Sequence, residues 1–274
     1  MFERFPLSVD SPSYFNNIET SEVVFHAINK SGSLSLESAI IEAFNFAGRS
    51  SEYLSHYQVH GSYESFYERV KIKHSRFVVG HNLWGRSAQI PGLQPRENRI
   101  WITQFRHPLP RFLSCHNWLK NINESAGKSF PSLKQFAIKT GGVSFTLVEQ
   151  FGGNWTKFKK DGETERTAES CYKASIDALE KHFHSLTIAE KFEESLFLVG
   201  RLCGLPSLAP WVRDNRNPGR KLFNEISDDE RDTVNSILYF DYQLYDYALK
   251  RFEKQITQID LDDPLPQPKM DNEE

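Results

Sequence analysis

The stretch Lys30 to Ser35, which reads Lys-Ser-Gly-Ser-Leu-Ser, places a cation, three hydroxyls and a glycine directly after the apolar run 23–28. A buried strand that ends in a glycine-containing turn and opens a helix leaves the first helical N–H groups unpaired. These groups, with the positive end of the helix dipole, attract a phosphate. We therefore predict an anion site formed by Lys30, Ser31, Gly32, Ser33, Leu34 and Ser35.

The position of the lysine argues against an ordinary nucleoside triphosphatase. A Walker A loop, GxxxxGK[ST], places its lysine after the last glycine. Here Lys30 precedes Gly32, and no second glycine lies upstream. We expect a phosphate site of a different kind.

A second anion motif follows the next long strand-like segment. Residues 106–114 read Arg-His-Pro-Leu-Pro-Arg-Phe-Leu-Ser, and Pro108 suits the start of a helix because its ring presets a backbone dihedral. Arg111 and Ser114 would share a face of that helix, while Arg106 lies at the end of the strand. Because guanidinium and hydroxyl groups are natural phosphate ligands, we predict that Arg106 and Ser114 bind a second anion. Arg111 either supports that site or braces the loop through a salt bridge.

In this order, the motifs resemble those of sulfotransferases that use 3′-phosphoadenosine 5′-phosphosulfate (PAPS), in particular the glycan-modifying branch that includes the heparan sulfate 2-O-sulfotransferases. The family's 5′-phosphosulfate motif, roughly hIPKTGGTSL, corresponds to residues 27–36, and its 3′-phosphate motif, RDPxxRxxS, to residues 106–114. Between them, the Gly-His pair of the glycan branch corresponds to Gly80 and His81.

The resemblance extends over about residues 23 to 252, because segments 190–196 and 241–248 resemble the family's late helical signatures. Three positions depart from the family's pattern: Asn29 stands for proline, Ser33 for a glycine and His107 for the aspartate of RDP. None of these changes removes a presumed ligand.

The resemblance implies that PAPS donates a sulfuryl group to an acceptor hydroxyl and leaves as the 3′,5′-bisphosphate PAP, with no metal required. Lys30 would neutralise the leaving oxygen, and His81 would act as general base. In the family a late loop closes over the donor, and Arg220 and Lys221 have the charge for that role.

A saccharide is the expected acceptor, while a lipid headgroup, a small phenol and a peptide tyrosine stay open. Trp84 and Arg86, close after His81, are weaker candidates for acceptor contact, and core packing is the commoner role of a tryptophan. Two other functions also stay open: a small-molecule or nucleotide kinase, which would want a Walker A lysine and an acidic Mg²⁺ ligand, and a catalytically degenerate binding protein.

The composition fits one elaborated α/β domain. With 274 residues and 39% hydrophobic content, we expect a single domain over residues 1–258 and an acidic flexible tail over residues 259–274. The formal net charge of −3 gives no general attraction to nucleic acid. The three cysteines show no CxxC spacing, and no apolar run reaches the roughly 20 residues that span a bilayer. A cytoplasmic protein without stable membrane insertion is expected.

The elements that must position these residues alternate between strand and helix. Strands are expected at 23–28, 76–80 and 99–105, and helices at 34–46, 63–71 and 109–120. The second half of the chain is expected to be mostly helical. One helix there should begin at a capping box, 227–230, and another should cover 241–256. Such alternation predicts a parallel sheet with helices on its faces. The resemblance implies in addition that the fold is a P-loop-like three-layer α/β fold with this sheet at its centre. Lys30, His81 and Arg106 each follow a strand, so they should meet at its carboxyl edge.

Overall fold

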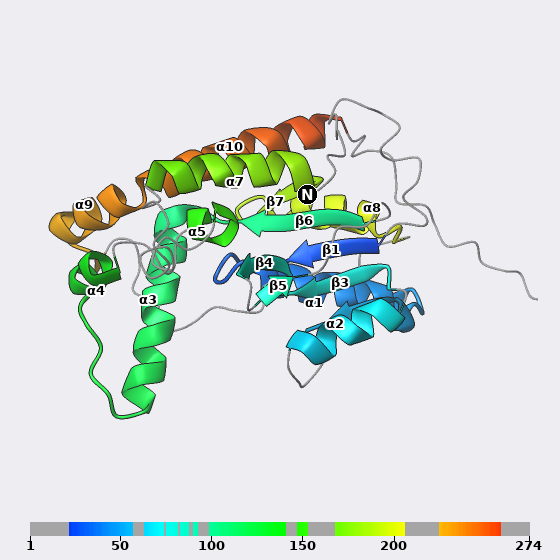
Figure 1. Cartoon of the computed structure of the whole chain (residues 1–274), viewed down its shortest axis with the longest axis horizontal. Coiled ribbons are helices and arrows are strands. Elements are labelled where there is room, and N and C mark those ends of the chain that lie inside the picture. Colours follow the sequence, from blue (N-terminus) through cyan, green and yellow to red (C-terminus); the bar gives the residue numbers. More distant parts are fainter. Residues whose placement is uncertain are drawn as a thin grey trace, which may run out of the picture.

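The computed structural model describes residues 22–56, 63–73, 75–81, 83–87, 90–92, 99–140, 147–152, 168–205 and 225–258. A five-stranded, all-parallel sheet in the order β2-β3-β1-β6-β7 forms its centre, with helices around it (Figure 1). The strands are β1 (Glu22–His26), β2 (Tyr53–Ser55), β3 (Phe77–Gly80), β6 (Arg99–Phe105) and β7 (Ser185–Ile188). This architecture confirms the predicted α/β fold class.

The helices and a small hairpin complete the described elements. The helices are α1 (Ser33–Phe46), η3 (Ser50–Glu52), α2 (Tyr63–Ile72), α3 (Pro108–Ser125), α4 (Leu133–Thr140), α5 (Leu147–Gly152), α7 (Ala168–His182), α8 (Phe192–Leu202), α9 (Asp228–Ile237) and α10 (Tyr239–Thr257). An antiparallel pair, β4 (Trp84–Ser87) and β5 (Ile90–Gly92), stands apart from the central sheet. Each predicted strand and helix exists, whereas the strands β2, β4, β5 and β7 were not predicted from the sequence.

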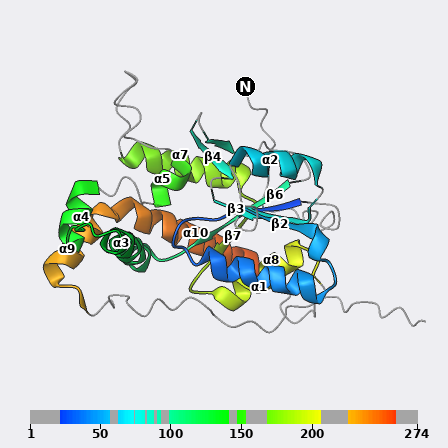
Figure 2. The same ribbon diagram turned by 90° about the horizontal axis from the view of Figure 1, so that it is seen from below.

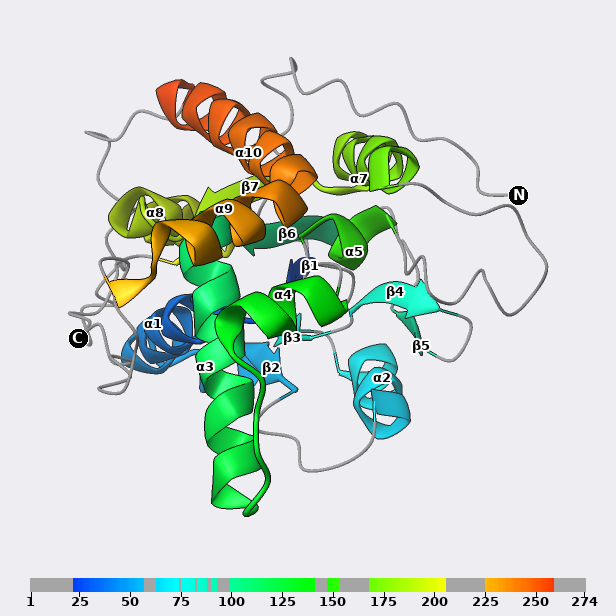
Figure 3. The same ribbon diagram turned by 90° about the vertical axis from the view of Figure 1, so that its left-hand side faces the viewer.

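The helices cover both faces of the sheet. In Figures 2 and 3, α1 and α8 lie on one face, and α2 and α7 lie on the other. Helix α10 runs beside α7 near the β7 edge (Figures 1 and 3). Helix α3 passes in front of the carboxyl ends of the strands (Figure 3), so the residues of its first turns are placed where the strands end.

Burial on both faces explains why β1 and β6 read as continuous runs rather than as an alternating pattern. All five residues of β1 and all seven of β6 are buried. Parallel strands covered by helices on both sides have this character. The charged first residues of the two strands, Glu22 and Arg99, pair with each other through a side-chain ion pair.

The register of the sheet brings three loops to one place. His26, the last residue of β1, lies opposite Gly80 of β3 and Thr103 of β6. Residues 27–30 therefore leave the sheet between the segments that follow β3 and β6. After β1 the chain adds β2 and β3 on one side of it and then β6 and β7 on the other. The carboxyl ends of β1 and β6 therefore form a topological switch point, the place where ligands bind in open α/β sheets.

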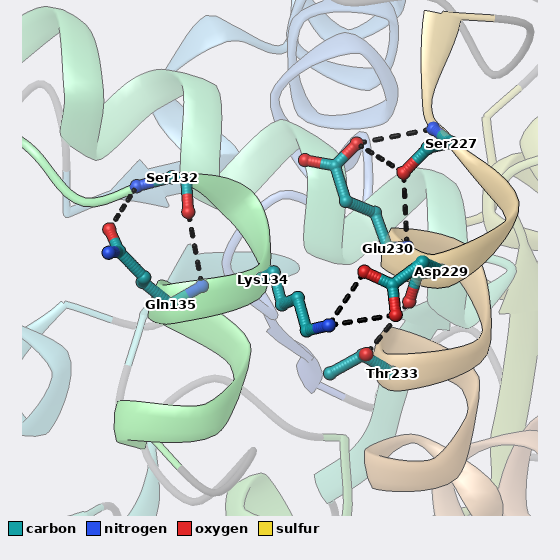
Figure 4. A network of polar contacts seen from close by, with 7 residues as sticks. All are labelled: Ser132, Lys134, Gln135, Ser227, Asp229, Glu230 and Thr233. Atoms are coloured by element: carbon teal, nitrogen blue, oxygen red, sulfur yellow. Dashed lines mark hydrogen bonds and ion pairs between the residues drawn. The ribbon is translucent and has the colours of Figure 1, made fainter.

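A second, smaller core lies under α3, α4 and α9. Its buried members are Leu109, Phe112, Leu113, Leu133, Phe136, Ala137, Ile226, Val234 and Leu238. At its rim, Ser227 and Glu230 form the predicted capping box at the start of α9, and Lys134 of α4 reaches Asp229 at 2.6 Å (Figure 4). Ser132 and Gln135 cap the start of α4 in the same way (Figure 4). The ion pair between Lys134 and Asp229 fastens α9 to α4, and the capping bonds fix the first turn of each helix.

Cys115, Cys171 and Cys203 are buried, and their thiols are free. None of the helices in the described part of the chain has the length and apolar character needed to cross a membrane. The predicted tail, 259–274, lies outside the described residues.

One buried carboxyl links α1 to the sheet. Glu37 is 4% exposed and accepts a hydrogen bond from the Ser55 hydroxyl at the end of β2. Burial raises its pKa to about 7 from an ordinary 4.5, and the bond from Ser55 opposes this shift. The folded state therefore holds the Glu37 proton more tightly than the unfolded chain does.

We expect the stability of the fold to decrease as the pH rises through this range. Burying protonated Glu37 costs little free energy, whereas burying its carboxylate costs more. The free energy of unfolding therefore decreases as the pH rises from the unfolded pKa of 4.5 to the folded pKa of about 7. Thermal unfolding at about pH 6 and about pH 8 should show a wild-type Tm several degrees lower at the higher pH. Glu37→Gln, which keeps an acceptor for Ser55, should remove most of this difference. A Glu37→Gln variant with the wild-type pH dependence would show that another group causes it.

Candidate functional site

A tight turn joins β1 to α1 and carries the predicted anion site. Gly32 is the N-cap of α1 with φ of 82°, and Lys30 also lies in the left-handed region, at 64°. The turn is closed by Ser31, whose hydroxyl donates to the Ile28 carbonyl at 2.9 Å, while the Ser33 hydroxyl reaches the same oxygen at 3.4 Å. A left-handed backbone is favourable for glycine but costs other residues conformational energy. The conformation of Lys30 is therefore strained and must be stabilised by the contacts of the turn.

The side chains predicted to bind the anion divide into two groups. Ser31 and Ser33 are buried, and their hydroxyls are already used inside the turn. Gly32 and Leu34 are exposed, and Ser35 is half-buried. Gly32 has no side chain, so its exposure is exposure of the backbone at the N-cap of α1, where a helix N-terminus can offer N–H groups to an anion.

Arg106 joins the second motif to the first. Its Nη1 donates a hydrogen bond of 3.2 Å to the Lys30 carbonyl. The two segments are 76 residues apart in sequence, and the pairing of β1 with β6 brings them together. The predicted convergence of Lys30 and Arg106 at one edge of the sheet is thus present in the structure.

The Lys30 ammonium lies over the ring of Trp118, 5.5 Å from its centroid. Partial burial lowers the pKa of Lys30; the nearby Cys115 opposes this shift, and Arg106 adds to it. Trp118 is 43% exposed and follows Ser114 by one helical turn on α3. The sequence analysis did not select Trp118, although its spacing from Arg111 and Ser114 puts it on their face of the helix.

His81 follows β3 and reaches the same turn from the other side. Its Nδ1 lies 2.6 Å from the carbonyl oxygen of Ala27. A carbonyl can only accept, so neutral His81 carries its proton on Nδ1, and the lone pair is on Nε2. Gly80 is required before it, because a Cβ there would lie 2.6 Å from the Cβ of His56. The Gly-His pair thus has a packing reason, and the imidazole has the tautomer of a base.

Arg111 acts as a brace. It is fully buried, and its Nε donates to the Asn29 carbonyl at 3.1 Å. Its charge also faces Asp241, whose carboxylate accepts hydrogen bonds from the backbone of Leu147 and Val148 at the start of α5. Burial raises the pKa of Asp241 to about 6, and Arg111 and these two bonds oppose the shift. Arg111 therefore connects the turn, through its bond to Asn29, with α10, which carries Asp241.

Ser114 is half-buried on α3. It precedes Cys115, whose thiol interacts electrostatically with Arg111, Lys30 and Arg106. Burial raises the pKa of the Cys115 thiol, and these three cations oppose the shift. The cations Lys30, Arg106 and Arg111 thus surround Cys115, the residue that follows Ser114 on α3.

Two late segments meet the 106–114 motif at its histidine. Glu190 accepts from the backbone N–H of His107 at 3.0 Å and from the Tyr245 hydroxyl at 3.1 Å. Burial, followed by the charge of Glu190, raises the pKa of Tyr245. The His107 ring packs edge-on against Tyr242 and Tyr245. Residues of segments 190–196 and 241–248 therefore contact the start of α3, a role that no local pattern in the sequence indicates.

The weaker acceptor candidates are placed differently. Trp84 packs against Trp101, His182 and Phe183, with ring centroids 4.9 to 5.6 Å apart, so the structure gives it a packing role. Arg86 belongs to β4, and the position of its side chain is outside the described part of the structure. Arg220 and Lys221, expected in a closing loop, also lie outside the described residues.

Comparison with known proteins adds no relative to this picture. No protein-family model matches the sequence, and no match was found among curated proteins. The order of the motifs and the contacts of their residues are therefore the observations from which a function is inferred.

Proposed function

We propose that the protein is a PAPS-dependent sulfotransferase that transfers a sulfuryl group to an acceptor hydroxyl, with a saccharide as the expected acceptor. One observation carries the proposal. The backbone carbonyls of Ala27, Asn29 and Lys30 receive side chains of His81, Arg111 and Arg106, respectively. The Gly80-His81 pair and the 106–114 motif, far from each other in sequence, thus both contact the turn that forms the first motif.

The charges at this turn suit a donor with two anionic groups. The exposed start of α1 and Lys30 would receive the 5′-phosphosulfate. Arg106 and Ser114 would receive the 3′-phosphate, with Arg111 supporting them through the turn. The expected closing residues Arg220 and Lys221 would add positive charge over the bound donor.

The reaction would be an in-line displacement at sulfur. A bond forms between sulfur and the acceptor oxygen, and the bond between sulfur and the oxygen of the 5′-phosphate breaks. His81 Nε2 takes the acceptor proton, while Lys30 neutralises the charge that develops on the leaving oxygen. Positioning and charge neutralisation would supply most of the rate enhancement, as in phosphoryl transfer.

Donor binding and turnover test this proposal separately. The protein should be retained on immobilised 3′,5′-ADP and eluted by PAP but not by ATP, because only PAP presents both phosphates to Arg106 and Lys30. Elution by ATP alone would favour the kinase alternative. Incubation with labelled PAPS and an acceptor panel should then give a product heavier by one sulfuryl group. Binding of PAP without turnover on any acceptor would favour the degenerate binding protein.

Replacing Arg106 tests the assignment of the 3′-phosphate. Arg106→Ala should weaken PAP binding by about 2 kcal/mol, roughly 30-fold, because a charge-assisted hydrogen bond is lost. Adenosine 5′-phosphosulfate, which lacks the 3′-phosphate, should lose little affinity. Calorimetric titration with both ligands makes the comparison. Equal losses would mean that Arg106 acts mainly through its bond to the Lys30 carbonyl, and the assignment would be wrong.

A further inference from the structure

Gln104, the next-to-last residue of β6, carries an amide for which the described residues offer no hydrogen-bond partner. The side chain is fully buried, and neither its Nε2 nor its Oε1 has a partner among the described residues. Its neighbour Thr103 is satisfied, since its hydroxyl donates to the His26 carbonyl at 2.8 Å. Gln104 therefore differs in this respect from its neighbour in the strand.

A buried amide without hydrogen-bond partners destabilises the folded state. Burying an amide without hydrogen bonds loses the energy of its hydration, and native structures contain few such groups. A leucine or methionine would fill the same space without that cost. A polar group that is retained against such a cost commonly serves function rather than stability.

The amide lies directly beneath the anion cradle, which we define as residues 29–33. Its Nε2 is 3.7 Å from the position that a Cβ on Gly32 would take, and Ala189 flanks the same point. Gly32 is the left-handed N-cap of α1, a helix of 14 residues. The amide thus lies next to the left-handed Gly32, the residue through which the cradle, with Lys30 also at positive φ, enters the helix.

We propose that Gln104 is a positioning residue for the anion cradle, whose amide forms hydrogen bonds with the cradle only when a phosphate-type or sulfate-type anion is bound. The anion draws the N–H groups of the cradle toward itself, and the peptide groups turn so that they can pair with the amide below. The hydrogen bonds that the Gln104 amide gains in the bound state then contribute to the anion affinity. A ligand shifts a conformational equilibrium only as far as it binds one state more tightly than the other. The identity of the anion as the 5′-phosphosulfate of PAPS rests on the proposed function, whereas the role of Gln104 does not.

The test is a variant that should gain stability and lose affinity together. Gln104→Met should raise the Tm of the ligand-free protein by about 2–6 °C, because an unpaired amide is removed from the interior. The same change should weaken binding of pyrophosphate and of PAP by about 10-fold in calorimetric titrations. Gln104→Leu gives a second apolar side chain and should behave in the same way.

Ser75 provides the matched control. Its hydroxyl is also buried, and in the part of the chain that the structure describes it has no hydrogen-bond partner. Ser75 precedes β3, at the opposite end of the sheet from the cradle. Ser75→Ala should leave the Tm unchanged or higher, with wild-type affinity for both anions. The control separates the removal of an unpaired polar group in general from its removal beneath the cradle.

The outcomes discriminate between the two proposals. Wild-type anion affinity in the Gln104 variants, or a lower ligand-free Tm in both, would overturn the role of Gln104 while leaving the proposed function untouched. Binding of pyrophosphate that depends on Gln104, without any binding of PAP, would support the cradle and contradict the sulfotransferase. Loss of affinity with a gain in Tm for both apolar variants is the expected result.

Discussion

Replacing His81 by alanine is expected to reduce turnover by ~10²- to 10⁴-fold, with PAP affinity close to that of the wild type. The reason is that, under the proposed function, Nε2 of His81 would take the acceptor proton, whereas the start of α1 and Arg106 would bind the donor. Steady-state rates with labelled PAPS and direct titration with PAP measure the two quantities separately. An alanine variant with near-normal turnover would remove His81 from the mechanism, and Glu64 or Glu68 on α2 would be the next bases to test.

The hydrogen bond from His81 to the Ala27 carbonyl allows a sharper control. In His81→Asn, the amide nitrogen is as many bonds from Cα as Nδ1 is, so it can still donate to Ala27, while no basic nitrogen remains. The asparagine variant should therefore keep the wild-type Tm and still lose turnover. Recovery of activity in His81→Asn would show that the histidine only holds the turn.

The pH dependence follows from the same assignment. Only the neutral imidazole can accept a proton, so the wild-type rate should fall on acidification through one ionisation, which for an ordinary imidazole lies near about pH 6.5. The residual activity of His81→Asn should lack this acid limb. A limb that persists in the variant would belong to another group.

The sequence predicted the central elements well because their patterns are local. Strand β6 was predicted at its observed bounds, since an uninterrupted buried run is followed by Arg106 and a proline that starts α3. Strand β7 was missed because its four residues carry no distinguishing pattern within a helical region. It forms because β6 offers a free edge and α10 covers it, and these are tertiary causes.

In the candidate site, too, local features could be predicted and tertiary contacts could not. Lys30, His81 and Arg106 could be predicted, because each follows a strand and the carboxyl ends of parallel strands share an edge. The contact of Glu190 with His107 spans 83 residues, and nothing in either segment alone indicates it. The orphaned amide of Gln104 is likewise invisible in the sequence, where a glutamine in a strand is unremarkable. What the sequence could not reveal is therefore how the predicted residues are held.

Loss of the Lys30 amine is expected to reduce kcat by ~10²-fold or more while weakening PAP binding less, because its charge matters most when the leaving oxygen becomes negative. Lys30→Ala keeps a Cβ at the left-handed position, so the backbone strain is unchanged. Lys120→Ala, which removes an exposed lysine from α3, controls for the change in net charge. Rates under saturating PAPS measure the effect on chemistry, and titration with PAP measures the effect on binding.

The contact of Lys30 with Trp118 gives this prediction an independent check. A cation over an exposed indole contributes only about 0.5–1 kcal/mol, so the ammonium can leave the ring for a bound anion. The emission of Trp118, obtained as the difference between the wild type and Trp118→Phe, should change when PAP binds. In Lys30→Ala this change should be lost. An equal loss of PAP affinity and no loss of kcat would show that Lys30 binds the donor without assisting the reaction, and Lys30 would then be a ligand of the cradle only.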